Sequence, residues 1–446
     1  MKLLQRIFVI LFASVTTVLY IALRLFHEIS IESRDLSPCV PPEPEVVVPH
    51  VMFTEMEPEM IVLPRKQYGL GIDGKPVEMN SSNLPKEDIL SYREGYEADD
   101  FNGYLSDLIS VHRIVDDYRP QICKSLNYRT DLPGVGVVIP FKNEHLSILL
   151  RTVYSVLYNT PAHLLNEIVL VDDGSTNSEL GSKLDIHIRN LPMVRVIRLQ
   201  ESRGLMMARQ AGIEELKSEY FVCMDCHMEV LPGWIEPLLN RLLEEPKALL
   251  CSNVGSIHQD TFGLNHAQLW QIRGTFPFLL FNLDTTVSKY TMDFIRARSN
   301  DTWPFPFGII QGMMIVMRRS WFLQLGGFDP GMKIWGSEQM ELSIKVWTCG
   351  GRVEMIPCSF VAHMYRRNVW KMKNEGVMNI LRVAEVWLDE HKYKIHEYYN
   401  NRRKVVKFFK RPSNYYVKRN DGRLADWLNG WLGDKLDGWL ADWLAC

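Results

Sequence analysis

The chain has 446 residues, 46% of them hydrophobic, which suffices for one folded domain of about 300 residues with an ample core. Its formal net charge of −3 gives no argument for binding nucleic acid across the whole chain. Eight cysteines are too few for a disulfide scaffold at this length, but they suit a domain in an oxidising compartment that carries a few bridges.

The N-terminus predicts a transmembrane signal anchor at residues 7–25. Lys2 and Arg6 precede an apolar run of about 17 residues, which is near the lower limit for a spanning helix. Positive charge before the run places residues 1–6 in the cytoplasm and the remainder of the chain in the lumen, although Arg24 weakens this bias. A cleaved signal peptide is the alternative, but no clear cleavage site with small residues follows the run.

Residues 26–100 are predicted to form a luminal stem. The segment Ser37–Lys86 is rich in proline and acidic residues and shows no sustained periodicity. Asn80 and Asn300 lie in Asn-x-Ser/Thr matches, which are consistent with a lumen but common by chance. A single folded domain is predicted over residues 101–400.

Apolar runs and helical patterns alternate in the first half of this domain. Strands are predicted at Gly136–Pro140, Ile168–Val171 and Val194–Leu199, and helical patterns follow the first and third of them. Such alternation implies an α/β fold with a mostly parallel sheet, whose ligands bind beyond the carboxyl ends of the strands.

Charged residues follow the predicted strands. Glu144, Asp173, Arg203 and Asp225 each come just after one. An acidic residue in such a loop can accept hydrogen bonds from a uracil or ribose, and an arginine can offset diphosphate charge. Each residue taken singly is better explained as a helix cap or a surface charge, but the four together indicate a nucleotide site.

The triplet Asp225-Cys226-His227 ends the apolar run Tyr220–Met224. A strand that ends in Asp-x-His presents two metal ligands side by side, which can hold a divalent cation against a diphosphate. Chance matches to so short a pattern are common, so its weight comes from the surrounding strands. Cys223, Cys226 and His227 lack a second ligand pair and do not make a structural zinc pattern.

Five further stretches carry a family resemblance, and they lie in order between Phe101 and Tyr393. They are Leu149–Leu157, Ile168–Asp173, Gly233–Leu239, Trp335–Glu338 and Ala384–Glu390. They resemble the polypeptide N-acetylgalactosaminyltransferases, which are Golgi enzymes. The resemblance implies a glycosyltransferase A-type fold with a mostly parallel central sheet.

The resemblance also implies roles for individual residues. Asp225 and His227 look like two ligands of a Mn²⁺ cofactor, and His363 looks like the third. Asp173 resembles a residue that contacts uridine, and Arg366 resembles a diphosphate contact. A bound cation and Arg366 would stabilise the charge that develops on the departing UDP.

Two further residues are implied in catalysis. Trp335 resembles the tryptophan of a mobile loop over the sugar nucleotide. In the retaining mechanism that the family implies, the acceptor hydroxyl attacks from the face of the leaving group, and the diphosphate takes its proton. Glu338 could alternatively act as a general base, as a carboxylate does in inverting transferases.

Several substrate-binding positions depart from the family pattern. Gln311-Gly312-Met313 stands where Ala-Gly-Gly is usual, and the Met313 side chain would enter the space beside the donor sugar. Arg203 is displaced by one position, and Cys226 stands where a small hydroxyl or alanine residue is usual. The metal site is therefore closer to the family pattern than the sugar and acceptor pockets.

The resemblance suggests that Cys123 pairs with Cys358, whereas Cys223, Cys226 and Cys251 are expected to be free thiols. The family normally carries a lectin-like domain after the catalytic domain, but none is expected here, because residues 401–446 are too few to form one. This tail has a basic run and then tryptophan and leucine at helical spacing. Docking on the catalytic domain is the preferred interpretation, with a partner or a membrane surface as alternatives.

The expected reaction is retaining transfer of N-acetylgalactosamine from UDP-GalNAc to serine or threonine of an acceptor polypeptide, in mucin-type O-glycosylation. The expected location is the Golgi membrane, as a single-pass type II protein with a luminal catalytic domain. Met313, the expected lack of a lectin domain, and Lys333, which stands where an acidic residue is usual, favour an alternative: a weak or inactive relative that binds UDP or a protein partner as a regulator. The Asp172–Ser175 loop and Glu338 leave open an inverting transferase that uses another UDP-sugar.

Overall fold

The computed structural model describes residues 69–79, 84–265, 300–366, 374–388, 392, 393 and 396. All of them belong to one compact unit, Glu43–Cys446. No helix in this part of the chain is both long and apolar enough to cross a membrane. The predicted anchor at residues 7–25 and the tail at 401–446 lie outside the described residues.

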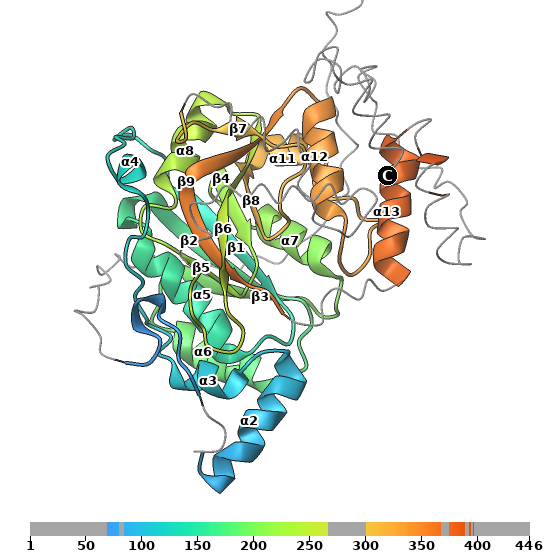
Figure 1. Cartoon of the computed structure of the whole chain (residues 1–446). Helices are drawn as coiled ribbons and strands as arrows, with labels where there is room; N and C mark the ends of the chain where they lie inside the picture. The colour runs from blue at the N-terminus through green and yellow to red at the C-terminus, as the bar shows by residue number, and fades with distance from the viewer. Residues whose placement is uncertain are drawn as a thin grey trace, which may run out of the picture. The chain divides into compact units, whose positions relative to one another are not determined.

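A mixed sheet forms the centre of the described part (Figure 1). The strand order is β3-β2-β1-β4-β8-β6-β9-β5, and β7 pairs with β9. The strands are β1 (Val135–Phe141), β2 (Leu165–Asp172), β3 (Val194–Arg198), β4 (Tyr220–Met224), β5 (Met228–Val230), β6 (Ala248–Ile257), β7 (Phe305–Pro306), β8 (Met314–Arg318) and β9 (Arg352–Met364).

The prediction of a mostly parallel sheet is correct in part, because the sheet is mixed: besides β1 to β4, strands β6 and β9 run parallel, but other neighbours do not. Strands β3, β2, β1 and β4 run parallel, and the strands predicted from the alternating pattern are all among them. Strand β8 is antiparallel to both β4 and β6, and β5 and β7 are antiparallel to β9. Apolar runs reveal strands but not the direction in which strands distant in sequence pair, so the alternating pattern gave no sign of these antiparallel pairs.

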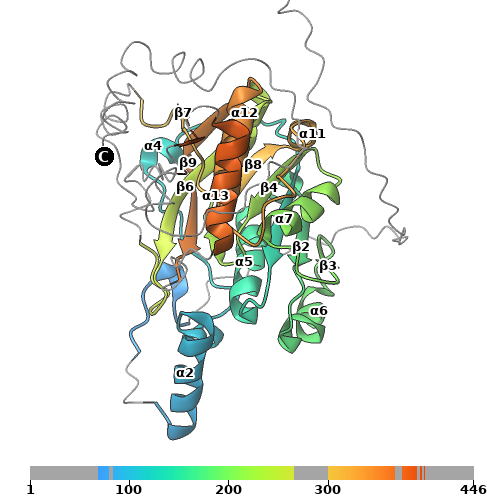
Figure 2. The ribbon, with the colours of Figure 1, turned by 90° about the vertical axis from the view of Figure 1, so that its right-hand side faces the viewer.

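Helices cover both faces of the sheet. They are α2 (Lys86–Asp99), α3 (Gly103–Leu108), α4 (Gln121–Lys124), α5 (Leu146–Asn159), α6 (Ser182–Ile188), α7 (Leu205–Glu214), α8 (Glu236–Glu244), α11 (Arg319–Gln324), α12 (Glu338–Thr348) and α13 (Asn374–Trp387), with 3-10 turns η1 (Ile72–Gly74), η3 (Ala162–Leu164) and η4 (Ser178–Leu180). Helices α7, α11, α12 and α13 share one apolar core with the sheet, and α5, α6 and α8 share the other. Figure 2 shows α12 and α13 in front of the sheet.

Burial on both faces explains the sequence of the central strands. Every residue of β1 is buried, so the strand is a nearly continuous apolar run without the alternation of a half-exposed strand. Successive side chains point to opposite faces, and Val137 and Val138 accordingly belong to different cores. The carboxyl ends of β1, β2 and β4 thereby lie together at one edge, where their polar loops meet.

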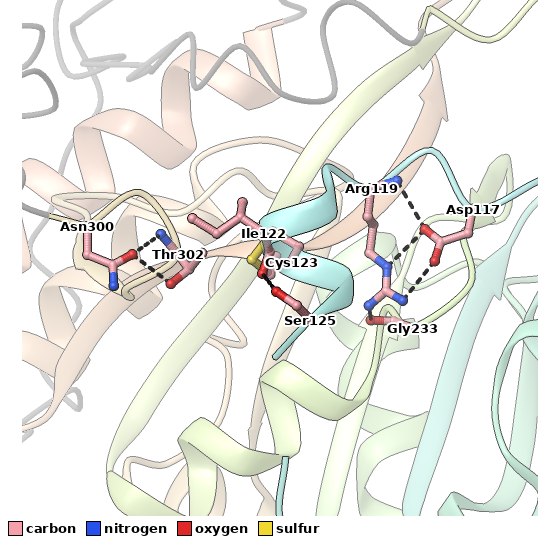
Figure 3. Close-up of a disulfide and its surroundings, with 9 residues drawn as sticks. Asp117, Arg119, Ile122, Cys123, Ser125, Gly233, Asn300 and Thr302 are labelled. Carbon is pink, nitrogen blue, oxygen red and sulfur yellow. Dashed lines mark hydrogen bonds and ion pairs between the residues drawn. A yellow bond between two sulfur atoms is a disulfide. The ribbon is translucent and has the colours of Figure 1, made fainter. Parts of the chain in front are cut away.

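A third apolar cluster lies around α3, α4 and the C-terminal half of β9. The disulfide that the family resemblance implied is present, and it joins Cys123 of α4 to Cys358 of β9. Figure 3 shows Arg119 next to this bridge, with its guanidinium donating to Asp117 and to the carbonyl of Gly233. The predicted free thiols Cys223, Cys226 and Cys251 are unbridged and buried.

Part of the predicted stem contacts the domain. The amide of Asp73 donates to Ile114 at 2.9 Å, and the carbonyl of Gly74 accepts from Leu264 at 2.7 Å. Helix α2 also lies within the predicted stem range. Packing around α3 therefore begins upstream of residue 101.

Candidate active site

Three predicted metal ligands meet at the carboxyl end of β4. Asp225, His227 and His363 each offer one donor atom, and these atoms lie within 4.8 Å of one another. The first two directly follow β4, whereas His363 comes from β9, which pairs with β5 in a register that sets Met228 opposite His363. One strand pairing thus joins a downstream histidine to the Asp-x-His triplet.

The surroundings of these residues fit a divalent cation. One carboxylate and two imidazoles are donors that such ions accept in proteins. Nε2 of His363 faces Asp225 Oδ2 at 3.5 Å, and its buried Nδ1 has no hydrogen-bond partner among the described residues. A buried imidazole nitrogen without a partner is costly unless another group binds there.

Glu144 orients the second histidine. Its carboxylate accepts from Nδ1 of His227 at 2.9 Å, so the lone pair of this imidazole is left on Nε2. Glu144 also forms an ion pair with Arg366, and its Oε2 lies 3.1 Å from the Cys226 thiol. The described partners of Glu144 are thus an imidazole, a guanidinium and a thiol, and its place in a nucleotide site stays a prediction.

Arg209 links the metal ligands to the proposed catalytic carboxylate. Its guanidinium is 1% exposed and donates to Asp225 Oδ1 at 2.7 Å, to Glu338 Oε1 at 3.2 Å and to the carbonyl of Gly312 at 2.7 Å. One buried cation from α7 thus fixes groups from three other segments. Nothing in the local sequence pattern around this arginine shows which carboxylates it meets.

Burial and charge set the protonation of these groups. Burial alone would raise the pKa of Asp225, but hydrogen bonding to His363 and the charge of Arg209 lower it to about 2. The pKa of Glu338 is raised because burial outweighs the charge of Arg209. Burial, followed by the charge of Glu144, raises the pKa of the Cys226 thiol well above its usual value. Asp225 is therefore an anion ready for a cation, whereas Glu338 is a weaker acid than a free carboxyl.

Met313 lies against the metal ligands. Its carbonyl accepts from the amide of Asp225 at 2.9 Å, and its sulfur lies 3.6 Å from the hydroxyl of Tyr365. The neighbouring Gly312 leaves room for Glu338, since a Cβ there would lie 3.1 Å from Glu338 Oε1. These two predicted sugar-binding positions do come together with the metal ligands.

Asp173 and Arg203 lie at the carboxyl end of β2. The Asp173 carboxylate accepts from the Ser202 hydroxyl at 2.8 Å and from the amides of Arg203 and Gly204 at 2.6 and 3.0 Å. The side chain of Arg203 is exposed. The described contacts of Asp173 therefore fix the turn before α7, and the uridine and diphosphate roles of both residues stay predictions.

Trp335 lies in a loop that leads into α12. Its side chain is 44% exposed, and the preceding Ile334 has a φ of 60°, which is rare for a β-branched residue. The Ile334 carbonyl accepts from the amide of Leu205, and Asn379 of α13 donates to the carbonyls of Lys333, Trp335 and Gly336. The loop is thus held between α7 and α13.

Comparisons with known proteins agree with this arrangement. The chain matches Glycosyl transferase family 2 over residues 136–326 and the N-terminal domain of galactosyltransferase over residues 293–367. It is 37% identical over 329 residues to polypeptide N-acetylgalactosaminyltransferase 10 of Homo sapiens, covering 73% of this chain and 53% of that protein. It is 36% identical over 335 residues to polypeptide N-acetylgalactosaminyltransferase 5 of Caenorhabditis elegans, covering 74% and 53%.

The chain therefore spans about half the length of these relatives. A solved structure, that of GalNAc-T7 with UDP, GalNAc and Mn²⁺, is similar with a TM-score of 0.64 and 31% identity, covering 78% of this chain and 63% of that one. Both sequence and fold thus lead to one conclusion: the chain has a glycosyltransferase A-type fold and belongs to the polypeptide N-acetylgalactosaminyltransferase family.

Proposed function

We propose that the protein transfers N-acetylgalactosamine from UDP-GalNAc to serine or threonine of polypeptides, with retention at the anomeric carbon. The observation that carries this proposal is the meeting of Asp225, His227 and His363 donor atoms within 4.8 Å in a member of this family. The similar structure of GalNAc-T7 contains UDP, GalNAc and Mn²⁺. Bound manganese would stabilise the negative charge of the departing diphosphate.

The residues around this site have separable roles in the proposal. Asp225, His227 and His363 would hold manganese, and Glu144 would keep His227 in the tautomer that binds it. Arg366 would neutralise diphosphate charge, as a guanidinium does well for phosphates. The exposed Trp335 would cover the sugar nucleotide.

The Glu338 carboxylate is already bound on both oxygens. Oε1 accepts from Arg209, and Oε2 accepts from the amide of Gly336 at 3.1 Å. A general base must reach the acceptor proton, which these bonds disfavour. They support a positioning role for Glu338 in a retaining reaction over the inverting alternative.

Replacing the aspartate ligand tests the proposal. Asp225→Ala should abolish manganese-dependent UDP binding and transfer to a mucin-like peptide, because it removes a metal ligand. Asp185→Ala is a control, since it removes a carboxylate that pairs with Arg198 at 2.9 Å on the surface. Unchanged manganese-dependent UDP affinity in folded Asp225→Ala protein would refute the metal assignment.

A weak or inactive relative that binds UDP is the second candidate function, and Met313 favours it. The side chain of this residue reaches Tyr365 beside the metal ligands, in the space where a glycine would leave room for the sugar. In that case the protein would bind UDP with manganese and transfer sugar poorly. A panel of UDP-sugars and peptides, assayed with and without manganese, separates the two functions.

We also propose a type II Golgi membrane protein, with an anchor at residues 7–25, a stem at 26–100 and a luminal catalytic domain at 101–400. The support is the charge pattern around the apolar run and the membership of the family. Protease treatment of sealed microsomes tests the orientation. Digestion of the catalytic domain without detergent would contradict it.

A further inference from the structure

A second group of metal-binding side chains lies beside the proposed manganese site. Glu144, Cys226 and His227 each offer one donor atom, and these atoms also lie within 4.8 Å of one another. We propose that these three residues, called here the thiol site, bind a thiophilic cation of the zinc class. The thiol site shares His227 with the proposed manganese site and takes its other two ligands from different side chains.

The distances between donor atoms suit a tetrahedral cation. Cys226 Sγ lies 3.1 Å from Glu144 Oε2 and 3.7 Å from His227 Nδ1, and Nδ1 lies 2.9 Å from Oε2. In a tetrahedral zinc site with bonds of about 2.0–2.3 Å, donor atoms lie about 3.3–3.6 Å apart. Shifts of a few tenths of an ångström would therefore place all three donor atoms at bonding distance from one ion, and the fourth tetrahedral position would stay open.

The donor set selects the cation. A thiolate favours zinc and cadmium over manganese, which prefers oxygen ligands. Thiolate binding releases the Cys226 proton to solvent, so affinity for the cation must offset the raised pKa of this buried thiol. The two anionic ligands and Arg366, which is paired with Glu144, give the zinc-loaded site a modest net positive charge.

Tertiary structure alone creates the thiol site. Glu144 follows β1 and Cys226 follows β4, and these strands are parallel neighbours. Their carboxyl ends therefore bring the two loops together. The sequence spacing of Cys223, Cys226 and His227 gave no zinc pattern because the third donor lies more than eighty residues upstream.

His227 couples the two sites. Without a cation its Nδ1 donates to Glu144 and leaves the lone pair on Nε2. A cation in the thiol site would take the Nδ1 lone pair and move the proton to Nε2, which could then no longer bind manganese. Zinc should therefore weaken manganese binding, and manganese should weaken zinc binding by the same factor. This coupling rests on the proposed function, whereas the thiol site itself does not.

Cadmium binding tests the thiol site without an enzyme assay. A cadmium–thiolate bond absorbs in the ultraviolet, so titrating the full chain with Cd²⁺ counts the sulfur ligands. We expect Cys226→Ala to bind one equivalent of thiolate-coordinated Cd²⁺ less than the wild type. Cys251→Ala, which removes another buried free thiol, should match the wild type. Equal stoichiometry of wild type and Cys226→Ala would overturn the proposal.

Zinc competition tests the coupling. Zn²⁺ should raise the manganese concentration needed for half-maximal UDP binding by the wild type. Cys226→Ala should need at least about 100-fold more zinc for the same effect, because a ligand has been removed. Equal zinc sensitivity would mean that zinc displaces manganese at its own ligands, which refutes the coupling. Absence of manganese-dependent UDP binding in the wild type would count against the proposed function, and the cadmium titration would still decide the thiol site.

Discussion

At the scale of single residues, the buried guanidinium of Arg209 organises the site. It is the shared partner of the candidate metal ligand Asp225 and of Glu338, and it also donates to the carbonyl of Gly312. Two carboxylates so close together would repel each other without a cation between them. The arginine therefore helps Asp225 to stay ionised, because hydrogen bonding to His363 and the charge of Arg209 together outweigh burial and lower the pKa of this carboxyl.

Arg209→Met should lower the free energy of unfolding by about 3–5 kcal/mol, because it leaves buried charges without a partner. Arg209→Lys should retain part of the stability but lose manganese-dependent UDP affinity, since an ammonium cannot reproduce the fork geometry. Urea unfolding and UDP titration measure the two effects. Arg195→Met is a control, because Arg195 also pairs with two carboxylates, at 3.3 and 3.9 Å, but is 33% exposed. Equal losses in both methionine variants would contradict the role given to Arg209.

Met313 is expected to limit turnover more than UDP binding. Met313→Gly should raise transfer from UDP-GalNAc several-fold and change UDP affinity little, because the side chain occupies space beside the sugar and not beside the nucleotide. Tyr365→Phe removes the hydroxyl next to the Met313 sulfur and should give a smaller gain. Robust transfer by the wild type that falls in Met313→Gly would show that the methionine belongs to a working pocket.

At the scale of elements, helix α13 holds the loop that carries Trp335. The Asn379 side chain is 2% exposed, accepts from the amide of Lys333 at 2.9 Å and donates to three loop carbonyls. These bonds offset the unfavourable backbone conformation of Ile334 in the same loop. The position of Trp335 therefore depends on a helix distant in sequence.

Asn379→Ala should release the loop that carries Trp335. The KM for the donor should then rise by a larger factor than that by which kcat changes. Stability should fall by about 1–3 kcal/mol, because buried loop groups lose their partner. Steady-state kinetics and thermal unfolding measure the two effects. Met378→Ala replaces a neighbouring side chain that is 38% exposed and serves as the control. A stability loss with an unchanged donor KM would mean that Asn379 is only structural.

At the scale of the whole molecule, a disulfide ties α4 to β9 across 235 residues of sequence. The bridge closes a long loop and so restricts the unfolded chain. It lies in the cluster around α3, whereas pairing of β9 with β5 and β6 places His363. Bridge and metal site are therefore expected to be separable.

Replacing Cys123 and Cys358 together with alanine should lower stability by about 2–4 kcal/mol. Manganese-dependent UDP affinity should change little, because the strand pairing that positions His363 remains. Thermal unfolding with and without a reducing agent provides the check. The reducing agent should lower the Tm of the wild type and leave the Tm of the double variant unchanged. Identical Tm values for all four samples would show that the disulfide does not stabilise the fold.

The sequence by itself determined the parallel strands β1 to β4 and pointed to the candidate metal ligands Asp225 and His227. Strands β1 and β4 are nearly continuous apolar runs, and such runs are detected in a sequence because both faces of the strand are buried. Asp225 and His227 could be found because they are adjacent to a strand end and match a family motif. His363 was found only through that resemblance, since a lone histidine in an apolar run carries no local signal.

Only the tertiary structure decided which groups meet. Antiparallel β8 separates β4 from β6, and its direction depends on long-range pairing that no local pattern encodes. In the sequence, Arg209 is an ordinary polar residue of a helical pattern, and only the fold places it between Asp225 and Glu338. Glu144 follows a strand like any loop acid, yet parallel pairing of β1 and β4 brings it to His227 and Cys226. Strand ends are local properties of a sequence, whereas the partners across a sheet edge are fixed by strand order, and strand order exists only in the folded chain.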